Sequence, residues 1–424
     1  MKKKILIISL FTLLTQHTLH SQWIPQSIPV NKPIIGIDFA DENTGWAITE
    51  NTSLTDTAYI LNTTNGGTNW NVQYGGNVAL NSMDAININI CYAGGSDING
   101  DAIFLKTTNG GLNWTVNNIG ANKVPDDMFF LNRDSGYICD NFSGGLYLTT
   151  DAGKSWLNRE NGLTVFPRTL FFLNYDTGYC GGGFKLFKTI NAGMDWNEDF
   201  NFGLLGNRIP LVIQFLSASL GWIGLNNNGL GITTNGGLNW SLAIPNSSGS
   251  YEFPGLFFEN DSIGWVGPDY SASIYKSTNS GYNWIRQNDP SGSRAITFIN
   301  IVTGWSGNNG ISKTTNGGLT FIIAENNELT NSFKLNQNYP NPFNPTTKIR
   351  FTITEHSDVT FGVYDILGRE IFNWKSDQSL QAGTYEYEFN GSNLSSGVYI
   401  YKLTAKQSGK NAVYSDTKKM ILLR

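Results

Sequence analysis

An octapeptide that occurs in seven copies limits what this chain can fold into more than any other feature. The first copy is TTNGGTNW at residues 63 to 70, and close copies stand at 107 to 114, 149 to 156, 189 to 196, 233 to 240, 277 to 284 and 314 to 321. The closing aromatic residues are 37 to 44 residues apart, close to the spacing of four-stranded propeller blades. The repeat therefore predicts a seven-bladed β-propeller.

A second pattern precedes each octapeptide and supplies the remaining strands of the blade. It is an apolar run followed by a small residue and an aromatic residue, as in IDFADENTGWAI at 37 to 48 and LFFLNYDTGYC at 170 to 180. Blade two diverges, with ININICYAGG at 86 to 95. Each unit spells two strands, a short third strand, the octapeptide and a fourth strand, which predicts four antiparallel strands per blade.

The octapeptide has the chemistry of a hairpin between the third and fourth strands. Thr63 and Asn65 offer short side-chain acceptors to backbone N–H groups, and Gly67 supplies dihedral angles that are costly for other residues. We expect Trp70 to pack back between the sheets. These residues are predicted to be structural.

The octapeptide resembles the Asp-box, or BNR-like repeat, of sialidase-like propellers. The resemblance is closest at Thr149, Asp151, Gly153 and Trp156, whereas asparagine replaces the aspartate in the other six copies. That asparagine-rich form is similar to the repeats of photosystem II assembly-factor propellers and of many secreted bacterial proteins. In the resembled propellers the box lies away from the usual ligand site, so the resemblance implies a structural role.

The N-terminus has the pattern of a signal peptide. Lys2, Lys3 and Lys4 precede an apolar run from Ile5 to Leu14, and Ser21 is a small residue at the expected cleavage position. Because about twenty apolar residues are needed to span a bilayer, the run is too short for a membrane helix. We expect domains at 1–21 (signal peptide) and 22–327 (propeller), and no integral membrane segment after signal removal.

A second domain follows a polar linker at 328–337. Residues 338–424 contain short strands of alternating apolar and polar residues, which predict a small Ig-like antiparallel β-sandwich. This domain closely resembles the type IX secretion system C-terminal sorting domain of Bacteroidota. The motifs that carry the resemblance are NYPNPFNP at 338 to 345, YDILGR at 364 to 369, SGVY at 396 to 399 and KKMIL at 418 to 422.

The sorting-domain resemblance implies a destination and a partner. In that family the domain directs a folded cargo across the outer membrane and is usually removed. The resemblance therefore implies the type IX secretion machinery as a partner through 338–424, and a cell-surface or secreted location in a didermal source. The net charge of −5 makes nucleic acid an unsuitable partner.

Candidate ligand-binding residues come from one set of loops. In a propeller the connections from the fourth strand to the next blade open on the same face as the turns between the second and third strands. Aromatic and charged side chains there suit a carbohydrate or peptide. The candidates are Arg159, Phe166, Arg168, Glu198, Asp199, Phe200, Arg208, Tyr251 and Glu252.

A catalytic reading has weaker support, and no catalytic residue, cofactor or metal ligand is assigned. Arg208, Ile209 and Pro210 look like the sialidase Arg-Ile-Pro motif, but they precede the fifth blade instead of the first. A xyloglucanase-like hydrolase would use two carboxylates from Glu160, Glu198, Asp199, Glu252 and Asp269, yet no spacing selects a pair. Asp97, Asn99 and Asp101 mimic part of a calcium loop that no acidic residue closes.

Two structural questions stay open from the sequence. Cys139 and Cys180 lie on second strands of neighbouring blades and could form a disulfide, although packing is the expected role of all three cysteines. Residues 23 to 29 resemble a fourth strand and could close the ring, but residues 320 to 324 compete for the same place.

We therefore expect an exported seven-bladed propeller with a sorting domain, acting as a non-catalytic binding or adhesion module. The alternative is a polysaccharide-degrading hydrolase of the sialidase-like or xyloglucanase-like type. A second alternative is a scaffold that binds a protein partner during assembly.

Overall fold

The computed structural model describes residues 23–51, 56–121, 123–227, 229–243, 251–269, 271–315, 317–318, 333–355, 357–375, 383–391, 394–407 and 413–423. The expected signal peptide and the competing strand at 320–324 lie outside these residues. Within them the fold is all-β, and the one helix is a short 3-10 helix, η1 (Phe202–Leu205). None of the described residues forms a helix long and apolar enough to cross a membrane.

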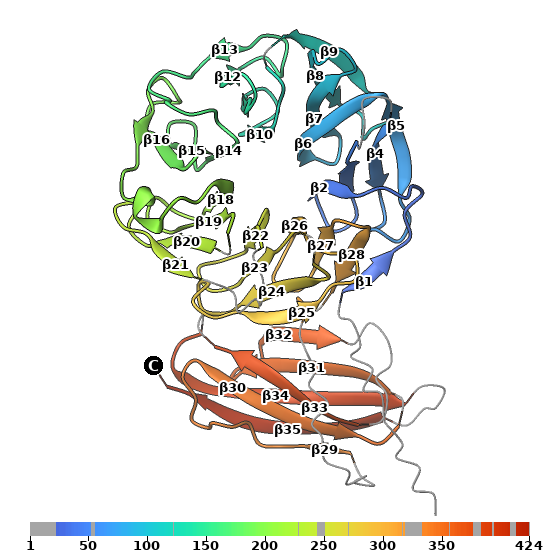
Figure 1. Cartoon of the computed structure of the whole chain (residues 1–424). Helices are drawn as coiled ribbons and strands as arrows, with labels where there is room; N and C mark the ends of the chain where they lie inside the picture. The colour runs from blue at the N-terminus through green and yellow to red at the C-terminus, as the bar shows by residue number, and fades with distance from the viewer. Residues whose placement is uncertain are drawn as a thin grey trace, which may run out of the picture.

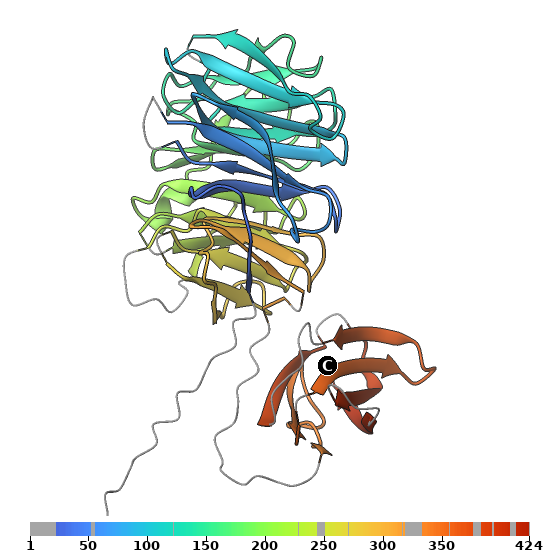
Figure 2. The same cartoon turned by 90° about the vertical axis from the view of Figure 1, so that its right-hand side faces the viewer.

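Among the described residues up to 314, seven four-stranded antiparallel sheets are arranged in a ring around a common centre (Figure 1). From the side the ring is a flat disc (Figure 2). Each sheet contains one octapeptide directly after its third strand, and the first strands lie nearest the centre. Apolar positions of the repeat therefore face neighbouring sheets.

The blades follow one another along the chain. Blade one is β2 (Ile34–Phe39), β3 (Gly45–Thr49), β4 (Ala58–Thr63) and β5 (Asn71–Gly76), and blade two is β6 (Val78–Asn87), β7 (Ile90–Asp97), β8 (Ala102–Thr107) and β9 (Thr115–Gly120). Blade three is β10 (Asp127–Phe130), β11 (Gly136–Cys139), β12 (Leu146–Thr149) and β13 (Leu157–Asn158), and blade four is β14 (Thr169–Phe172), β15 (Gly178–Gly182), β16 (Lys185–Thr189) and β17 (Asn197–Glu198).

The remaining blades complete the ring. Blade five is β18 (Pro210–Phe215), β19 (Gly221–Leu225), β20 (Gly229–Thr233) and β21 (Ser241–Ala243), and blade six is β22 (Gly255–Phe258), β23 (Gly264–Gly267), β24 (Ser273–Ser277) and β25 (Ile285–Asn288). Blade seven contains β26 (Ala295–Phe298), β27 (Gly304–Gly307) and β28 (Ile311–Thr314), and its outer strand is β1 (Ile24–Gln26) from the N-terminal end.

The hypothesis that the N-terminal segment closes the ring is therefore confirmed for β1. Ile24 pairs with Lys313 and Gln26 with Ile311 in an antiparallel register. Trp23, which precedes β1, is fully buried and donates its indole N–H to Gln287 Oε1 at 3.0 Å. Both ends of the propeller sequence thus share one sheet, and the ring cannot open without breaking that sheet.

Stacked aromatic rings join neighbouring blades and explain the motif upstream of the octapeptide. The second-strand Tyr179 of blade four lies parallel to the first-strand Phe215 of blade five, with ring centroids 3.8 Å apart. The glycine before that tyrosine, Gly178, leaves space for Phe172 of its own blade, whose ring an added Cβ would overlap. The same stacking joins Tyr92 to Phe130, Tyr137 to Phe172, Trp222 to Phe258, Trp265 to Phe298 and Trp305 to Phe39.

The octapeptide is a hairpin held by its own side chains. Thr63 Oγ1 accepts the Gly67 N–H at 2.9 Å, and Asn65 Oδ1 accepts the Asn69 N–H at 2.9 Å. Gly67 has φ of 91°, in the left-handed region that favours glycine. The first of these bonds recurs in every copy, at Gly111, Gly153, Gly193, Gly237, Gly281 and Gly318.

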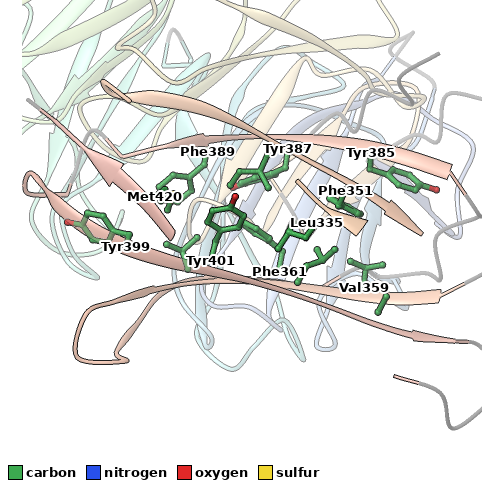
Figure 3. Close-up of a cluster of buried hydrophobic side chains, with 14 of the residues drawn as sticks. Leu335, Phe351, Val359, Phe361, Tyr385, Tyr387, Phe389, Tyr399, Tyr401 and Met420 are labelled. Carbon is green, nitrogen blue, oxygen red and sulfur yellow. The ribbon is translucent and has the colours of Figure 1, made fainter. Parts of the chain in front are cut away.

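The C-terminal domain is a small β-sandwich of two antiparallel sheets. One sheet has the order β29 (Lys334–Leu335), β30 (Thr346–Ile353), β33 (Gly383–Asn390), and the other has β32 (Glu370–Lys375), β31 (Ser357–Asp365), β34 (Gly397–Gln407), β35 (Val413–Leu422). Phe351, Phe361, Tyr387, Tyr401 and Met420 point into the space between the sheets (Figure 3). Alternating residues of each strand therefore build its core.

The three cysteines are free and buried. Cys139 and Cys180 do lie in one apolar cluster between blades three and four, as the strand positions allowed, but they form no disulfide. Burial raises the pKa of both thiols, because a thiolate would be poorly solvated there. Packing is the role that the structure gives them.

Candidate functional site

The strand order separates the connections of the propeller onto two faces. Each octapeptide contacts the turn between the first and second strands of its own blade, as where the Gly66 N–H donates to the Asn43 carbonyl at 2.8 Å. The second-to-third-strand turns and the connections to the next blade lie at the opposite strand ends. We call that side the loop face, and it carries the residues expected to bind a ligand.

Four phenylalanines on the loop face expose their rings. Phe142 and Phe184 lie in the second-to-third-strand turns of blades three and four and are 90% and 50% exposed. Phe166 and Phe200 lie in the connections that leave these two blades and are 58% and 78% exposed. We call these four residues the phenylalanine patch. Exposed apolar rings on the loops of two neighbouring blades mark a place where covering by a partner would be favourable.

The segments that carry the patch contact one another. The ring of Phe166 lies against Gly144 in the turn of Phe142, so closely that an added Cβ would stand 2.7 Å from it. The backbone carbonyl of Phe166 lies against Gly182, the last residue of β15 before the turn that contains Phe184. Two turns and one connection therefore meet around Phe166.

An ion pair joins the fourth segment to this group. Lys185, the residue after Phe184, donates to Thr164 Oγ1 at 3.2 Å and lies 2.8 Å from Glu198 Oε2. It thereby links the connection after blade three to the end of β17, two residues before Phe200. The carboxylate of Glu198, a predicted ligand residue, is neutralised by this lysine.

Three other predicted ligand residues have structural roles. Asp199 Oδ2 accepts the Trp240 indole N–H of the next blade at 2.9 Å, and Asp199 Oδ1 accepts the Asn201 N–H. The guanidinium of Arg208 binds the carbonyls of Leu205, Asn226 and Asn227. The backbone carbonyl of Arg159 accepts the Trp196 indole N–H at 2.8 Å, and its side chain binds the Asn158 carbonyl. These groups hold the connections to the blades.

The remaining predicted residues are more open or belong to another connection. Arg168 is exposed, and its backbone N–H pairs with the Gly181 carbonyl at the start of blade four. Tyr251 packs partly on the apolar cluster between blades five and six, and Glu252 beside it is exposed. Sequence reasoning found Phe166 and Phe200 but missed Phe142 and Phe184. The sequence signal of the missed pair is a single aromatic residue in the turn between the second and third strands of a blade.

Carboxylates on the inner strands form a second feature that sequence reasoning missed. Each accepts a backbone N–H from the inner strand of the next blade: Asp38 Oδ2 from Ala85 at 2.9 Å, Asp84 Oδ2 from Phe130 at 2.6 Å and Asp127 Oδ2 from Leu170 at 3.0 Å. Their signal was an acidic residue inside an otherwise apolar first strand. They join blades one to four near the centre of the ring.

The protein surroundings of these carboxylates change their acidity. Burial raises the pKa of Asp38 and Asp127 to about 6. Burial, with the neighbouring Asp38 charge, raises the pKa of Asp84 to about 8. The backbone N–H bonds act in the opposite direction but do not outweigh the loss of water. Asp84 is therefore largely protonated at neutral pH.

Across the described residues, no group of three or more His, Cys, Asp or Glu side chains could hold a metal ion. In the calcium-like stretch, Asp97 Oδ1 accepts the N–H groups of Asn99 and Asp101, so it caps a hairpin turn. Among the carboxylates weighed for hydrolysis, Glu198 and Asp199 are engaged as described, and Asp269 is 7% exposed.

Family models match two parts of the chain. Residues 337–421 match the secretion system C-terminal sorting domain. Residues 15–165 match the photosynthesis system II assembly factor YCF48. No curated protein matches the chain.

Solved structures share the propeller architecture. A structure of YCF48 bound to D1 peptide has a TM-score of 0.56 and 19% identity, covering 70% of this chain and 96% of that one. YCF48 from Cyanidioschyzon merolae has a TM-score of 0.54 and 17% identity, covering 69% and 98%. The GH74 enzyme of Niastella koreensis has a TM-score of 0.53 and 11% identity, covering 94% and 74%. At these identities the likeness shows the fold alone.

Proposed function

This chain is a BNR-like repeat propeller with a sorting domain for the type IX secretion system, and we propose that it acts outside the cell as a non-catalytic binding module. The sorting domain supports the location, since it directs the chain to the cell surface or the medium. We further propose that the phenylalanine patch on the loop face is the ligand-binding surface. An initial signal peptide at 1–21 would start the export route.

The observation that carries the proposal is the exposure of the patch. Phe142 and Phe200 are 90% and 78% exposed, whereas Phe202, in the same connection as Phe200, is completely buried. Covering a phenylalanine is worth roughly 1.5 to 3 kcal/mol, so several rings could contribute much of a binding free energy. Several exposed aromatic rings on adjoining loops are typical of an interaction surface.

The chemistry of the patch favours a protein segment over a sugar. All four rings are phenylalanines, which have no hydroxyl or indole N–H to bind a sugar hydroxyl. Apolar peptide side chains need only the ring faces. The YCF48 structure with a bound D1 peptide, of the same fold, adds support for a peptide ligand.

A hydrolase would need a different arrangement. Glycosidases use two carboxyl groups roughly 5 to 10 Å apart across the bound sugar. Glu198 and Asp199 are two of the five candidates, and both are held in structural contacts by Lys185 and Trp240. Their engagement supports the binding proposal over hydrolysis.

The test compares binding by the purified chain with binding by two double variants. The probes are arrays of apolar and polar peptides and of plant and bacterial glycans. F166S/F200S should weaken binding to the selected peptide at least about tenfold. The control, L112S/L238S, changes two octapeptide residues on the side of the ring opposite the loop face. Leu112 and Leu238 are 83% and 69% exposed, and this variant should bind as the unaltered chain does.

Three outcomes would contradict the proposal. These are peptide binding that F166S/F200S leaves unchanged, selective glycan binding, and release of reducing sugar from any polysaccharide. Sugar release would direct the search to Glu160, Glu252 and Asp269.

A further inference from the structure

The octapeptides and the first-to-second-strand turns form the side of the ring opposite the loop face, and we call it the octapeptide face. Its blades differ at the sixth octapeptide position. This position is Thr68 in the first copy and Lys154 in the third, so the hairpin folds with a polar residue there. In blades two and five it is Leu112 and Leu238, which are 83% and 69% exposed. Folding therefore does not explain these two apolar side chains.

The turns of blades two and five add to the apolar surface. Ile88 in the turn of blade two is 47% exposed, and Leu216, directly after β18 of blade five, is 37% exposed. Each turn contacts the octapeptide of its own blade, as where the Gly236 N–H donates to the Ser219 carbonyl at 2.8 Å. Blades two and five thus each present an apolar tip.

The two blades between them carry opposite charges on the same face. In blade three Lys154 is exposed, and in blade four Asp176 and Asp195 are exposed. Asp195 accepts only the side-chain amides of Asn161 and Asn191 and the backbone N–H of Asn191's hairpin, all of them neutral groups. Within the described part of the chain none of these three ions forms an ion pair.

Blade four also departs from the repeat at an exposed position. Ile190 is 70% exposed, whereas the second octapeptide position is threonine in the other six copies. Met194, at the sixth position of the same octapeptide, is 59% exposed. Apolar side chains beside carboxylates suit a lysine, whose aliphatic stem covers apolar surface while its ammonium group reaches an anion.

We propose that the octapeptide face binds a second copy of this chain, about a two-fold axis that lies between the two faces and passes between blades three and four. The blades follow one another around the ring in chain order (Figure 1). The axis therefore lays blade three of each copy on blade four of the other, and blade two on blade five. Leu112 meets Leu238 of the other copy, and the Lys154 stem crosses Ile190 while its ammonium group reaches Asp176.

Charge favours a second copy over a partner of one sign. A uniformly acidic or basic partner would be repelled by either blade three or blade four, whereas a second copy satisfies both. The same axis lays blade one on blade six, where Asp41, Glu42 and Asp261 are exposed carboxylates. The two discs therefore diverge on that side, and the contact is confined to blades two to five. The phenylalanine patch lies on the opposite face and has no part in it.

The test is the oligomeric state of the purified full chain, measured by sedimentation velocity over a micromolar concentration series. The unaltered chain should dimerise, and L112S/L238S should raise the dimer dissociation constant at least about tenfold. K154D sets like charges against each other and should weaken the dimer by at least about tenfold, and K154D/D176K, which exchanges the two charges, should restore it. The control F166S/F200S, on the loop face, should dimerise as the unaltered chain does.

Thermal unfolding of each variant separates a folding defect from a lost contact. If L112S/L238S has a lowered Tm, L112T/L238T, with the residue of the first copy, replaces it and must show the same loss. A chain that stays monomeric throughout the series would overturn the proposal. So would a dimer that L112S/L238S and K154D leave intact, a folded K154D/D176K that stays monomeric, or a dimer that F166S/F200S abolishes. Unchanged peptide binding by a monomeric L112S/L238S would support two separate faces.

Discussion

Trp23 lies edge-on against Phe298 of blade seven, with ring centroids 5.7 Å apart and an interplanar angle of 90°. In blades one and three to six the octapeptide tryptophan has this place, as where Trp70 meets Phe39 edge-on at 5.9 Å. A residue that comes before the first blade thus completes the aromatic packing of the last one. Closure of the ring depends on a side chain outside the repeats.

The first prediction concerns Trp23. Trp23→Ala should lower the free energy of unfolding by about 3 to 5 kcal/mol, because it leaves a cavity at the junction that closes the ring. Trp23→Phe, the conservative control, keeps a ring beside Phe298 but loses the hydrogen bond to Gln287 and part of the buried indole, so a smaller loss of about 1 to 2 kcal/mol is expected. Urea unfolding of the purified chain measures both, and equal losses would contradict the account.

The second prediction concerns the glycines of the second strands. Gly304→Ala places a Cβ into the ring of Phe298 and should cost about 1 to 3 kcal/mol through overpacking. Gly203→Ala is the control, because nothing lies within 4 Å of the added Cβ. Thermal unfolding of the two variants should separate them, and a stable Gly304→Ala would show that the stack can shift.

How far the sequence predicts this fold can be judged from these residues. Octapeptides and Gly-aromatic pairs are local patterns, so each blade could be predicted from its own residues. The similarity of residues 23 to 27 (WIPQS) to the fourth-strand residues 70 to 74 (WNVQY) even suggested that the segment of Trp23 closes the ring. Asp84 was not anticipated, because its partner, the Phe130 N–H, lies in another blade. The spacing of the repeats does not show which polar groups of neighbouring blades meet between their inner strands.

The candidate site was predicted less well, for a physical reason. Phe200 and Phe202 are two residues apart in one connection, yet one is 78% exposed and the other is completely buried. Only Phe200 was among the predicted ligand residues, but the composition of this connection gives no reason to separate the two rings. Only the groove between blades four and five, which Phe202 fills beside Trp240, decides between them.

The third prediction is a pH dependence that comes from Asp84. Its pKa is about 8 in the folded chain and 3.8 without the fold, so the folded state holds an extra proton between these values. Stability contributed by this group is therefore present at low pH and is lost as the pH rises from about 4 towards 8. Asp38 and Asp127, with pKa values of about 6, add to the loss in the lower part of that window.

Asp84→Asn tests this effect, because the amide oxygen can still accept the Phe130 N–H while the group carries no charge. The variant should be more stable than the unaltered chain at pH 8, and the difference should shrink towards pH 5. Urea unfolding at pH 5, 6.5 and 8 measures it. A difference that is constant across the three values would show that the carboxyl of Asp84 does not titrate in this range.

The fourth prediction concerns thiol reactivity. Cys91, Cys139 and Cys180 are each completely buried, and burial raises the pKa of each thiol, so the reactive thiolate is both rare and out of reach. Iodoacetamide at pH 8 should leave the native chain unmodified and should alkylate three cysteines once the chain is unfolded in urea without reductant. Intact-mass spectrometry counts the added groups.

A single alkylated cysteine after unfolding would mean that Cys139 and Cys180, which share one core cluster, had formed a disulfide during export. Cys139→Ser is the control that separates this case, because it would then restore alkylation of Cys180 and leave two reactive thiols.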